Sequence, residues 1–400
     1  MPPTAGLAAL NFFTADVQGG LGPSLATWLA ASAHWSAERI GFVMTVSGIA
    51  GLVFNGPAGA LVDREGRPRL FAAIATAAVA TGTLAMLPAG SFIAIVSAQI
   101  AATAGGALMA PAVTALTLGI VGKDAFAHQQ GRNQAWNHAG NVVAALLVAA
   151  ATFALGAASA FWVLAGMAVG SLLTLLAIPS RAITDRRLRG HASDNADATL
   201  LSVLADRRLL ALGFALLLFH LGNAAMLPQL GQRMAAIGSG DATRWLAACV
   251  IIAQLTMVPV AIATSWAADH GYRTWLLPAT CAVLCIRGVM AAMATEPLWL
   301  VPIQMLDACG AGTLGVAVPI LVADFTWGSG RTQTALGAVA TFQGIGAALS
   351  GSFGGVLATQ IGWTASFLGL TAPAVAALAL SLLLAGQASR LNAAAIRARV

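Results

Sequence analysis

Apolar residues dominate this chain in long runs, and short polar stretches separate the runs. A helix that crosses a bilayer needs about 20 predominantly apolar residues, and the runs reach that length. The pattern therefore predicts an all-α membrane protein with twelve transmembrane helices. The predicted helices occupy residues 6–31, 40–62, 70–88, 91–120, 134–157, 160–179, 208–231, 243–268, 274–293, 297–323, 332–358 and 363–386.

A single long polar stretch interrupts this series, at residues 180–207. Its charged residues are Arg181, Asp185, Arg186, Arg187, Arg189, Asp194, Asp197, Asp206 and Arg207. It divides the apolar runs into six and six. The sequence therefore predicts an N-terminal six-helix bundle over 1–179, a cytoplasmic linker over 180–207, and a C-terminal six-helix bundle with a short cytoplasmic tail over 208–400.

The composition agrees with a lipid environment. Hydrophobic residues make up 58% of the chain and charged residues only 8%, whereas a soluble domain carries about 25% charged residues. The net charge of +6 has an explanation other than nucleic acid, because cytoplasmic loops of membrane proteins retain Lys and Arg. We expect no nucleic-acid partner, no cofactor and no metal, and we interpret Cys281 and Cys285 as small packing residues.

The distribution of Lys and Arg predicts the orientation. With both termini inside, 16 of the 20 basic residues fall in inner segments, three in outer loops, and Arg287 within segment 274–293. This asymmetry is typical of a multi-pass protein whose termini are cytoplasmic. We expect a bacterial inner-membrane protein that is a monomer.

A short charged segment recurs in the two halves. Gly59–Arg69 lies between two apolar runs, and a degenerate copy, Ser265–Arg273, lies 206 residues later. Three further matches occur at similar offsets, in the same order. They are Pro23 with Pro228, Pro111 with Pro319, and Gly131–Gln134 with Gly330–Gln333. A repeated pattern of this kind indicates a duplicated transport fold.

Over nearly its full length the chain resembles the major facilitator superfamily, because Gly59–Arg69 is similar to that family's Gly-x-x-x-Asp-Arg-x-Gly-Arg-x-Arg signature. The resemblance implies two six-helix bundles around a cavity that opens alternately to either side. It implies that the first, fourth, seventh and tenth helices line this cavity. It also implies a conformational latch, with Asp63 near the start of the eleventh helix, where an anion is stabilised. The predicted gate residues are Gly59, Asp63, Arg64, Gly66, Arg67, Asp269, Arg273, Arg132, Arg331 and His138.

Polar side chains within the apolar runs are the candidate functional residues, since such groups are costly in lipid. Asp16 and Asp307 each lie about ten residues into a helix, where a carboxylate could exchange a proton. His220 is a third proton-coupling candidate, and its alternative is a neutral ring bonded to a backbone carbonyl. The predicted substrate-binding amides are Gln18, Gln99, Asn141, Asn223, Gln254, Gln304 and Gln343.

Two positions leave the mechanism open. Arg287 has two interpretations, a snorkelling side chain or an ion pair with Glu296 or Asp307. Gln99 occupies the position at which many drug–proton antiporters of the superfamily have an arginine, twelve residues before a proline such as Pro111. The proline of their fifth helix is also absent from residues 140–156.

These features predict a secondary transporter that moves a small polar or cationic organic molecule by alternating access. Proton-coupled export is the leading hypothesis, and proton-coupled uptake is its alternative. No phosphate-binding loop is present, and Lys123 is the only lysine, so nothing in the sequence indicates nucleotide hydrolysis as the energy source. An enzyme is not expected, because the sequence has no catalytic metal or paired-acid motif. A non-transporting membrane sensor on the same fold is the rival from another class.

Overall fold

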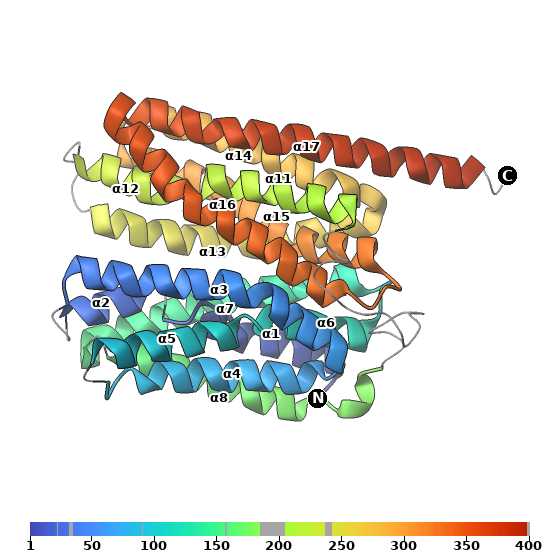
Figure 1. Ribbon diagram of the computed structural model, residues 1–400, viewed down its shortest axis with the longest axis horizontal. Helices are drawn as coiled ribbons and strands as arrows, with labels where there is room; N and C mark the ends of the chain where they lie inside the picture. Colours follow the sequence, from blue (N-terminus) through green and yellow to red (C-terminus); the bar gives the residue numbers. More distant parts are fainter. Residues whose placement is uncertain are drawn as a thin grey trace. The chain divides into compact units, whose positions relative to one another are not determined.

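The computed structural model describes residues 1–21, 23–31, 35–89, 91–156, 158–184, 205–236 and 242–397, and within these residues every regular element is a helix (Figure 1). The first group is α1 (Pro3–Gly19), α2 (Pro23–Ala31), α3 (Ala37–Glu65), α4 (Pro68–Ala85), α5 (Phe92–Gly106), α6 (Met109–Val121), α7 (Phe126–Leu155) and α8 (Ser159–Ala177). The second group is α11 (Arg207–Asn223), α12 (Met226–Ala236), α13 (Ala242–Ala267), α14 (Leu276–Met293), α15 (Leu300–Thr326), α16 (Thr332–Ile361) and α17 (Trp363–Arg397).

The predicted fold class is confirmed. Ten described helical segments are long and apolar enough to cross a membrane. One of them, Ala248–Met293, is 46 residues long and contains most of α13 and all of α14, so it accounts for two crossings. The pair α1 and α2 supplies a further crossing in two pieces. The helices are thus consistent with the predicted count of twelve.

Three helices that the apolar pattern predicts as continuous are broken near the middle. Segment 6–31 divides between α1 and α2, segment 91–120 between α5 and α6, and segment 208–231 between α11 and α12. At the first break Gly20 has a φ of 57°, and Pro23 begins the next helix without an N–H to continue the hydrogen-bond ladder. Each break frees backbone groups that an intact helix would pair.

Internal contacts divide the chain into two compact units. The first contains residues 1–200 together with 326–338, and the second contains residues 201–325 and 339–400. The first turns of α16 therefore belong to the first unit. Residues 185–204 of the predicted linker lie outside the described residues, and the predicted bundle boundaries stay a prediction. The last helix, α17, continues past its predicted end at 386 as far as Arg397.

In the first unit, α1 packs against α7 and α8, while α4 packs against α5, α6 and α8. Its core contains the fully buried side chains Leu7, Leu10 and Met109. Gly140 of α7 faces the backbone carbonyl oxygen of Phe12, so the two helices approach each other there without an intervening side chain.

Replacing Gly140 with alanine is expected to lower the thermal stability of the purified protein. The new Cβ would overlap the Phe12 carbonyl oxygen and lie 2.9 Å from the Ala15 Cβ, and overpacking of this kind costs about 1–3 kcal/mol. Gly166→Ala in α8 is the matched control, because a Cβ there meets nothing within 4 Å. Thermal unfolding in detergent measures both, and equal midpoints would contradict the inferred close contact.

In the second unit, α17 packs against α14 and α11, and α12 packs against α13. Glycines again mark close approaches: Gly346 of α16 faces the backbone carbonyl oxygen of Leu217, and Gly288 of α14 faces the Thr371 hydroxyl. This packing holds α11, α14 and α16 close to one another through α17 and fixes the positions of the polar side chains on α11 and α14.

Candidate functional site

A buried ion pair is the main polar feature of the second unit. The Arg287 side chain of α14 is 1% exposed, and its Nη1 lies 3.1 Å from the Oδ1 atom of Asp307 in α15. The same Nη1 donates to the Asn223 side-chain oxygen of α11. A charge removed from solvent needs a partner of opposite charge and hydrogen bonds, and here α15 and α11 supply them to Arg287.

The Asp307 carboxylate accepts hydrogen bonds on both oxygens. Asn223 Nδ2 donates to Oδ1 at 3.2 Å, and Gln304 Nε2 donates to Oδ2 at 2.8 Å. Gln304 and Asp307 are three residues apart and share a face of α15. Two atoms of this Arg287–Asp307–Asn223–Gln304 cluster, Arg287 Nε and Gln304 Oε1, are buried without a hydrogen-bond partner among the described residues. The cluster therefore has unused hydrogen-bonding capacity.

These contacts decide between the two interpretations of Arg287 and place the ring of His220. The snorkelling interpretation of Arg287 is wrong, because the side chain is buried and paired with Asp307. His220 Nδ1 lies 2.9 Å from the backbone oxygen of Leu216, as in the alternative of a ring bonded to the backbone. Gln254 in α13 and Gln343 in α16 are half-buried residues of the same unit.

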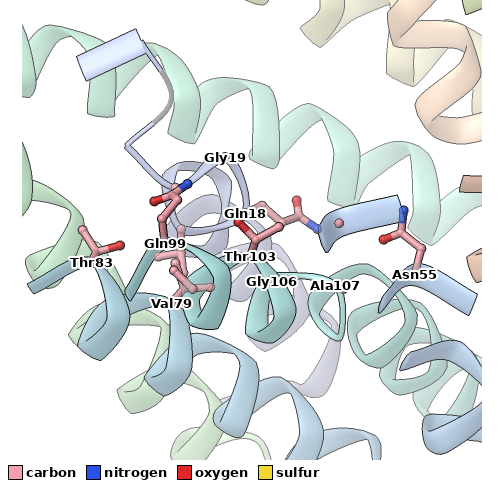
Figure 2. A pocket seen from close by; sticks show the side chains of 13 residues that line it. Gln18, Gly19, Asn55, Val79, Thr83, Gln99, Thr103, Gly106 and Ala107 are labelled. Atoms are coloured by element: carbon pink, nitrogen blue, oxygen red, sulfur yellow. The ribbon is translucent and has the colours of Figure 1, made fainter. Parts of the chain in front are cut away.

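The first unit contains a polar cavity of about 280 Å³ between α1, α3, α4 and α5 (Figure 2). Five polar side chains line it: Gln18, Asn55, Thr83, Gln99 and Thr103. None of the described lining residues is charged. Gln18 and Gln99, both predicted substrate-binding residues, thus share one cavity.

Two helix breaks form part of the cavity wall. Gly19 and Gly20 mark the break between α1 and α2, and Gly106 and Ala107 mark the break between α5 and α6. Tight turns replace the regular hydrogen-bond ladder there: the Gly20 N–H donates to the Val17 backbone oxygen at 3.2 Å, and the Leu108 N–H donates to the Gly105 backbone oxygen at 3.1 Å. Broken helices next to a polar cavity are typical of binding sites in membrane transport proteins.

A chain of amides on α7 reaches this cavity. Asn137 Nδ2 donates to Gln18 Oε1 at 3.5 Å and to the Asn11 backbone oxygen at 3.3 Å. Asn141 Nδ2 in turn donates to Asn137 Oδ1 at 3.4 Å. The predicted residue Asn141 therefore connects to the cavity through Asn137, which the sequence analysis missed. The signal that points to it is the four-residue spacing of Gln129, Asn133, Asn137 and Asn141.

Asp16 directly precedes the lining residues Val17 and Gln18 in the sequence but is not itself among the described residues that line the cavity. Its carboxylate is half-buried in α1 and has no hydrogen-bond or ion-pair partner among the described residues. Asp16 is two residues before Gln18, so the two side chains leave α1 in different directions.

Asp63 lies in the last turn of α3 and binds the first turn of α16. Its carboxylate accepts hydrogen bonds from the Gln333 backbone N–H at 3.1 Å, the Thr334 backbone N–H at 2.6 Å and the Thr334 hydroxyl at 2.8 Å. The first N–H groups of a helix have no partner within the helix, and its N-terminus favours an anion. Asp63 therefore acts as a tertiary cap for α16.

Glycines permit this contact. Gly59 faces the Gln333 carbonyl oxygen, and Gly337 faces the Asn55 carbonyl oxygen, so a side chain at either position would push α3 and α16 apart. The charged segment is also more helical than the predicted loop, because α3 continues to Glu65. Gly66, with a φ of 64°, then ends the helix.

The other predicted gate residues are placed as follows. Arg64, Arg67 and Arg132 are exposed, His138 is buried in α7, and Arg331 directly precedes α16. In Ser265–Arg273, the degenerate copy of the charged segment, Asp269 lies in the turn Ala268–Tyr272. Arg273 Nη1 lies 3.1 Å from the Asp324 carboxylate. Asp324 was missed, and its position near the end of an apolar run is the only sequence signal for it.

A multi-pass helical protein with broken helices beside a polar cavity and a buried ion pair defines the class of membrane transport proteins. The chain belongs to the major facilitator superfamily, whose family model matches residues 7–326. It is 39% identical over 379 residues to the uncharacterized MFS-type transporter Rv2456c of Mycobacterium tuberculosis, covering 93% of this chain and 91% of that protein. It is 27% identical over 349 residues to the inner membrane transport protein YajR of Escherichia coli, covering 83% and 72%.

Solved structures share the fold at low identity. A bacterial homologue of the iron transporter ferroportin, in an outward-facing state, matches with a TM-score of 0.77 at 13% identity, covering 96% of this chain and 100% of that chain. The human organic anion transporter MFSD10 matches with a TM-score of 0.74 at 14% identity, covering 95% and 100%. The predicted family is confirmed, and the protein is a multi-pass transporter of a family that moves small molecules rather than an enzyme family.

Proposed function

We propose that this protein exports a small polar or cationic organic solute across the bacterial inner membrane in exchange for protons, as a monomer with both termini in the cytoplasm. The observation that carries the proposal is the buried Arg287–Asp307 pair, because a buried ion pair in a transport protein couples the protonation of one group to the position of another. Proton-coupled uptake uses the same groups in the opposite direction and is the second candidate.

The coupling step begins at Asp307. Protonation of its carboxylate removes the charge that compensates Arg287, and a buried guanidinium without an anion costs several kcal/mol. Arg287 must then move toward water or toward another acceptor. Since Arg287 also binds Asn223, this movement changes the contact between α14 and α11. Proton uptake is thereby linked to a change in helix packing.

Asp16 is the second proton site in this proposal. A half-buried carboxylate without a partner among the described residues is free to gain or lose a proton without breaking an ion pair. The other predicted carrier, His220, keeps its ring bonded to Leu216 and has a supporting role. The amides Gln18, Gln99, Asn141, Asn223, Gln254, Gln304 and Gln343 contribute hydrogen bonds to the solute or to the coupling groups.

The Asp63 contact is the latch of the transport cycle. Its hydrogen bonds to Gln333 and Thr334 hold the cytoplasmic end of α16 against α3 in one conformation. The other conformation requires that these bonds break. The latch thus sets the balance between the two states, and the remaining gate residues adjust it through their charges.

The test is proton movement in proteoliposomes that contain an internal pH dye. With a pH gradient imposed, we expect addition of a transported solute to move protons in the wild-type protein. Asp307→Asn is expected to abolish this signal, whereas the exposed control Asp124→Asn keeps it. Unchanged proton movement in both Asp16→Asn and Asp307→Asn would contradict the hypothesis of proton coupling. The absence of flux for every solute in a broad panel would favour the membrane sensor instead.

A further inference from the structure

The two halves of the repeat carry different chemistry at equivalent positions. Gln18 and Asn223 are 205 residues apart, Gln99 and Asp307 are 208 residues apart, and both spacings match the repeat. In the second unit, Asn223 and Asp307 bind Arg287. In the first unit, the amides Gln18 and Gln99 face a cavity instead. The duplicated site has therefore become an ion-paired cluster in one half and a neutral cavity in the other.

The lining of the cavity limits the charge of its ligand. Among the described residues, no Asp, Glu, Lys, Arg or His lines it. A charged solute taken from water into a site without an opposite charge loses several kcal/mol of solvation that amides and hydroxyls do not restore. The cavity therefore favours an uncharged ligand.

The free hydrogen-bonding groups limit the polarity of the ligand. The side chains of Asn55, Gln99 and Thr103 have no hydrogen-bond partner among the described residues, and each side-chain amide offers both donors and acceptors. An apolar ligand would strip water from these groups without replacing its hydrogen bonds. A ligand with several hydroxyl groups pairs with both kinds of group at once.

The size and the apolar part of the wall complete the description. A volume of about 280 Å³ lies just below the roughly 300–1,000 Å³ range of pockets for drug-sized ligands, so the cavity suits one smaller molecule. Val79, Ala102 and Gly106 supply an apolar surface between the polar groups. Such a surface suits the C–H face of a compact polyol or sugar ring.

We infer that the cavity of the first unit binds a neutral polyhydroxylated solute of about monosaccharide size. This inference rests on the proposed transport function and narrows its substrate class from polar or cationic to neutral. It also assigns different roles to the two units: the first unit binds the solute, and the Arg287–Asp307 pair of the second unit changes when Asp307 is protonated.

The test is binding and transport of labelled xylitol, D-xylose and myo-inositol by the full protein in proteoliposomes, against choline as a cation and lactate as an anion. We expect at least one of the neutral compounds to bind, and neither ion to compete with it. Gln99→Leu and Asn55→Leu are expected to weaken that binding about tenfold each. Gln360→Leu, at an exposed position of α16, is the matched control and keeps wild-type binding.

Three outcomes contradict the inference. The first is binding of choline or lactate that depends on Gln99, and the second is binding of none of the neutral compounds. The third is polyol binding that Gln99→Leu leaves unchanged. Gln99→Glu is expected to admit choline, because it adds the missing counter-charge. The same experiment distinguishes failure of this inference from failure of the proposed proton coupling. Polyol flux without proton movement supports the inference and contradicts proton coupling. Proton-coupled choline flux supports proton coupling and contradicts the inference.

Discussion

Arg287→Met is expected to destabilise the protein by about 3–5 kcal/mol and to abolish transport. The substitution leaves the Asp307 carboxylate largely buried, and its remaining hydrogen-bond donors among the described residues are the amides of Asn223 and Gln304. Removing one partner of a buried ion pair is more costly than removing both, because the remaining charge has no compensation. Thermal unfolding in detergent and solute flux in proteoliposomes measure the two effects.

The double variant Arg287→Met/Asp307→Asn separates the two effects. It removes both charges, so we expect it to recover most of the lost stability while proton-coupled transport stays absent. Arg273→Met is the matched control, because its partner Asp324 is also 3.1 Å away but the two side chains are 28% and 26% exposed. A partly exposed pair of this kind is worth about 0–1 kcal/mol. Equal stability of Arg287→Met and Arg273→Met would contradict a charge-compensating role for Arg287.

Asp63→Ala is expected to release the start of α16 and to slow solute transport about tenfold. The change removes the hydrogen bonds to the Gln333 and Thr334 backbone and to the Thr334 hydroxyl. Loss of a helix cap costs about 0.5–2 kcal/mol, and 1.4 kcal/mol shifts a two-state equilibrium tenfold. A cysteine placed at Ser329 reports the shift through faster labelling by a membrane-impermeant thiol reagent in inside-out vesicles.

Glu65→Ala is the matched control for this experiment. Glu65 is an exposed acid two residues after Asp63 at the end of α3, so its removal changes the local charge equally without touching α16. We expect labelling and transport to stay at the wild-type level in Glu65→Ala. Labelling in Asp63→Ala at the rate of the Glu65→Ala control would show that the contact does not hold the two helices together.

Much of the fold could be predicted because apolar length and periodic interruption are local properties. A lipid-spanning helix satisfies its own backbone, so each run of suitable length reports one crossing without knowledge of its neighbours. The pairing of Gln304 with Asp307 was accessible for the same reason, since residues three apart share a helix face. The position of Asp63 at the start of α16 followed from the family signature rather than from spacing.

The helix breaks could not be placed from the apolar pattern. Segment 6–31 is predominantly apolar on both sides of Gly20, and the break there depends on a positive φ that glycine permits but does not require. Likewise, Arg287 is close enough to the end of its helix for its side chain to snorkel, so its sequence position does not distinguish snorkelling from a buried ion pair. Its pairing depends on the rotation of α14 relative to α11 and α15, which is a property of the packed unit.

The sequence by itself determined that this is a helical membrane protein of the major facilitator superfamily with a repeated pattern in its two halves. It also determined which few polar residues lie in the membrane segments. Only the tertiary structure decided that Gln18 and Gln99 share an uncharged cavity, that Asn137 connects Asn141 to it, and that Arg287 compensates Asp307. The physical reason is the same in each case. Transfer to lipid depends on the composition of a segment, whereas a hydrogen bond depends on distances of about 3 Å that helix rotation and packing set.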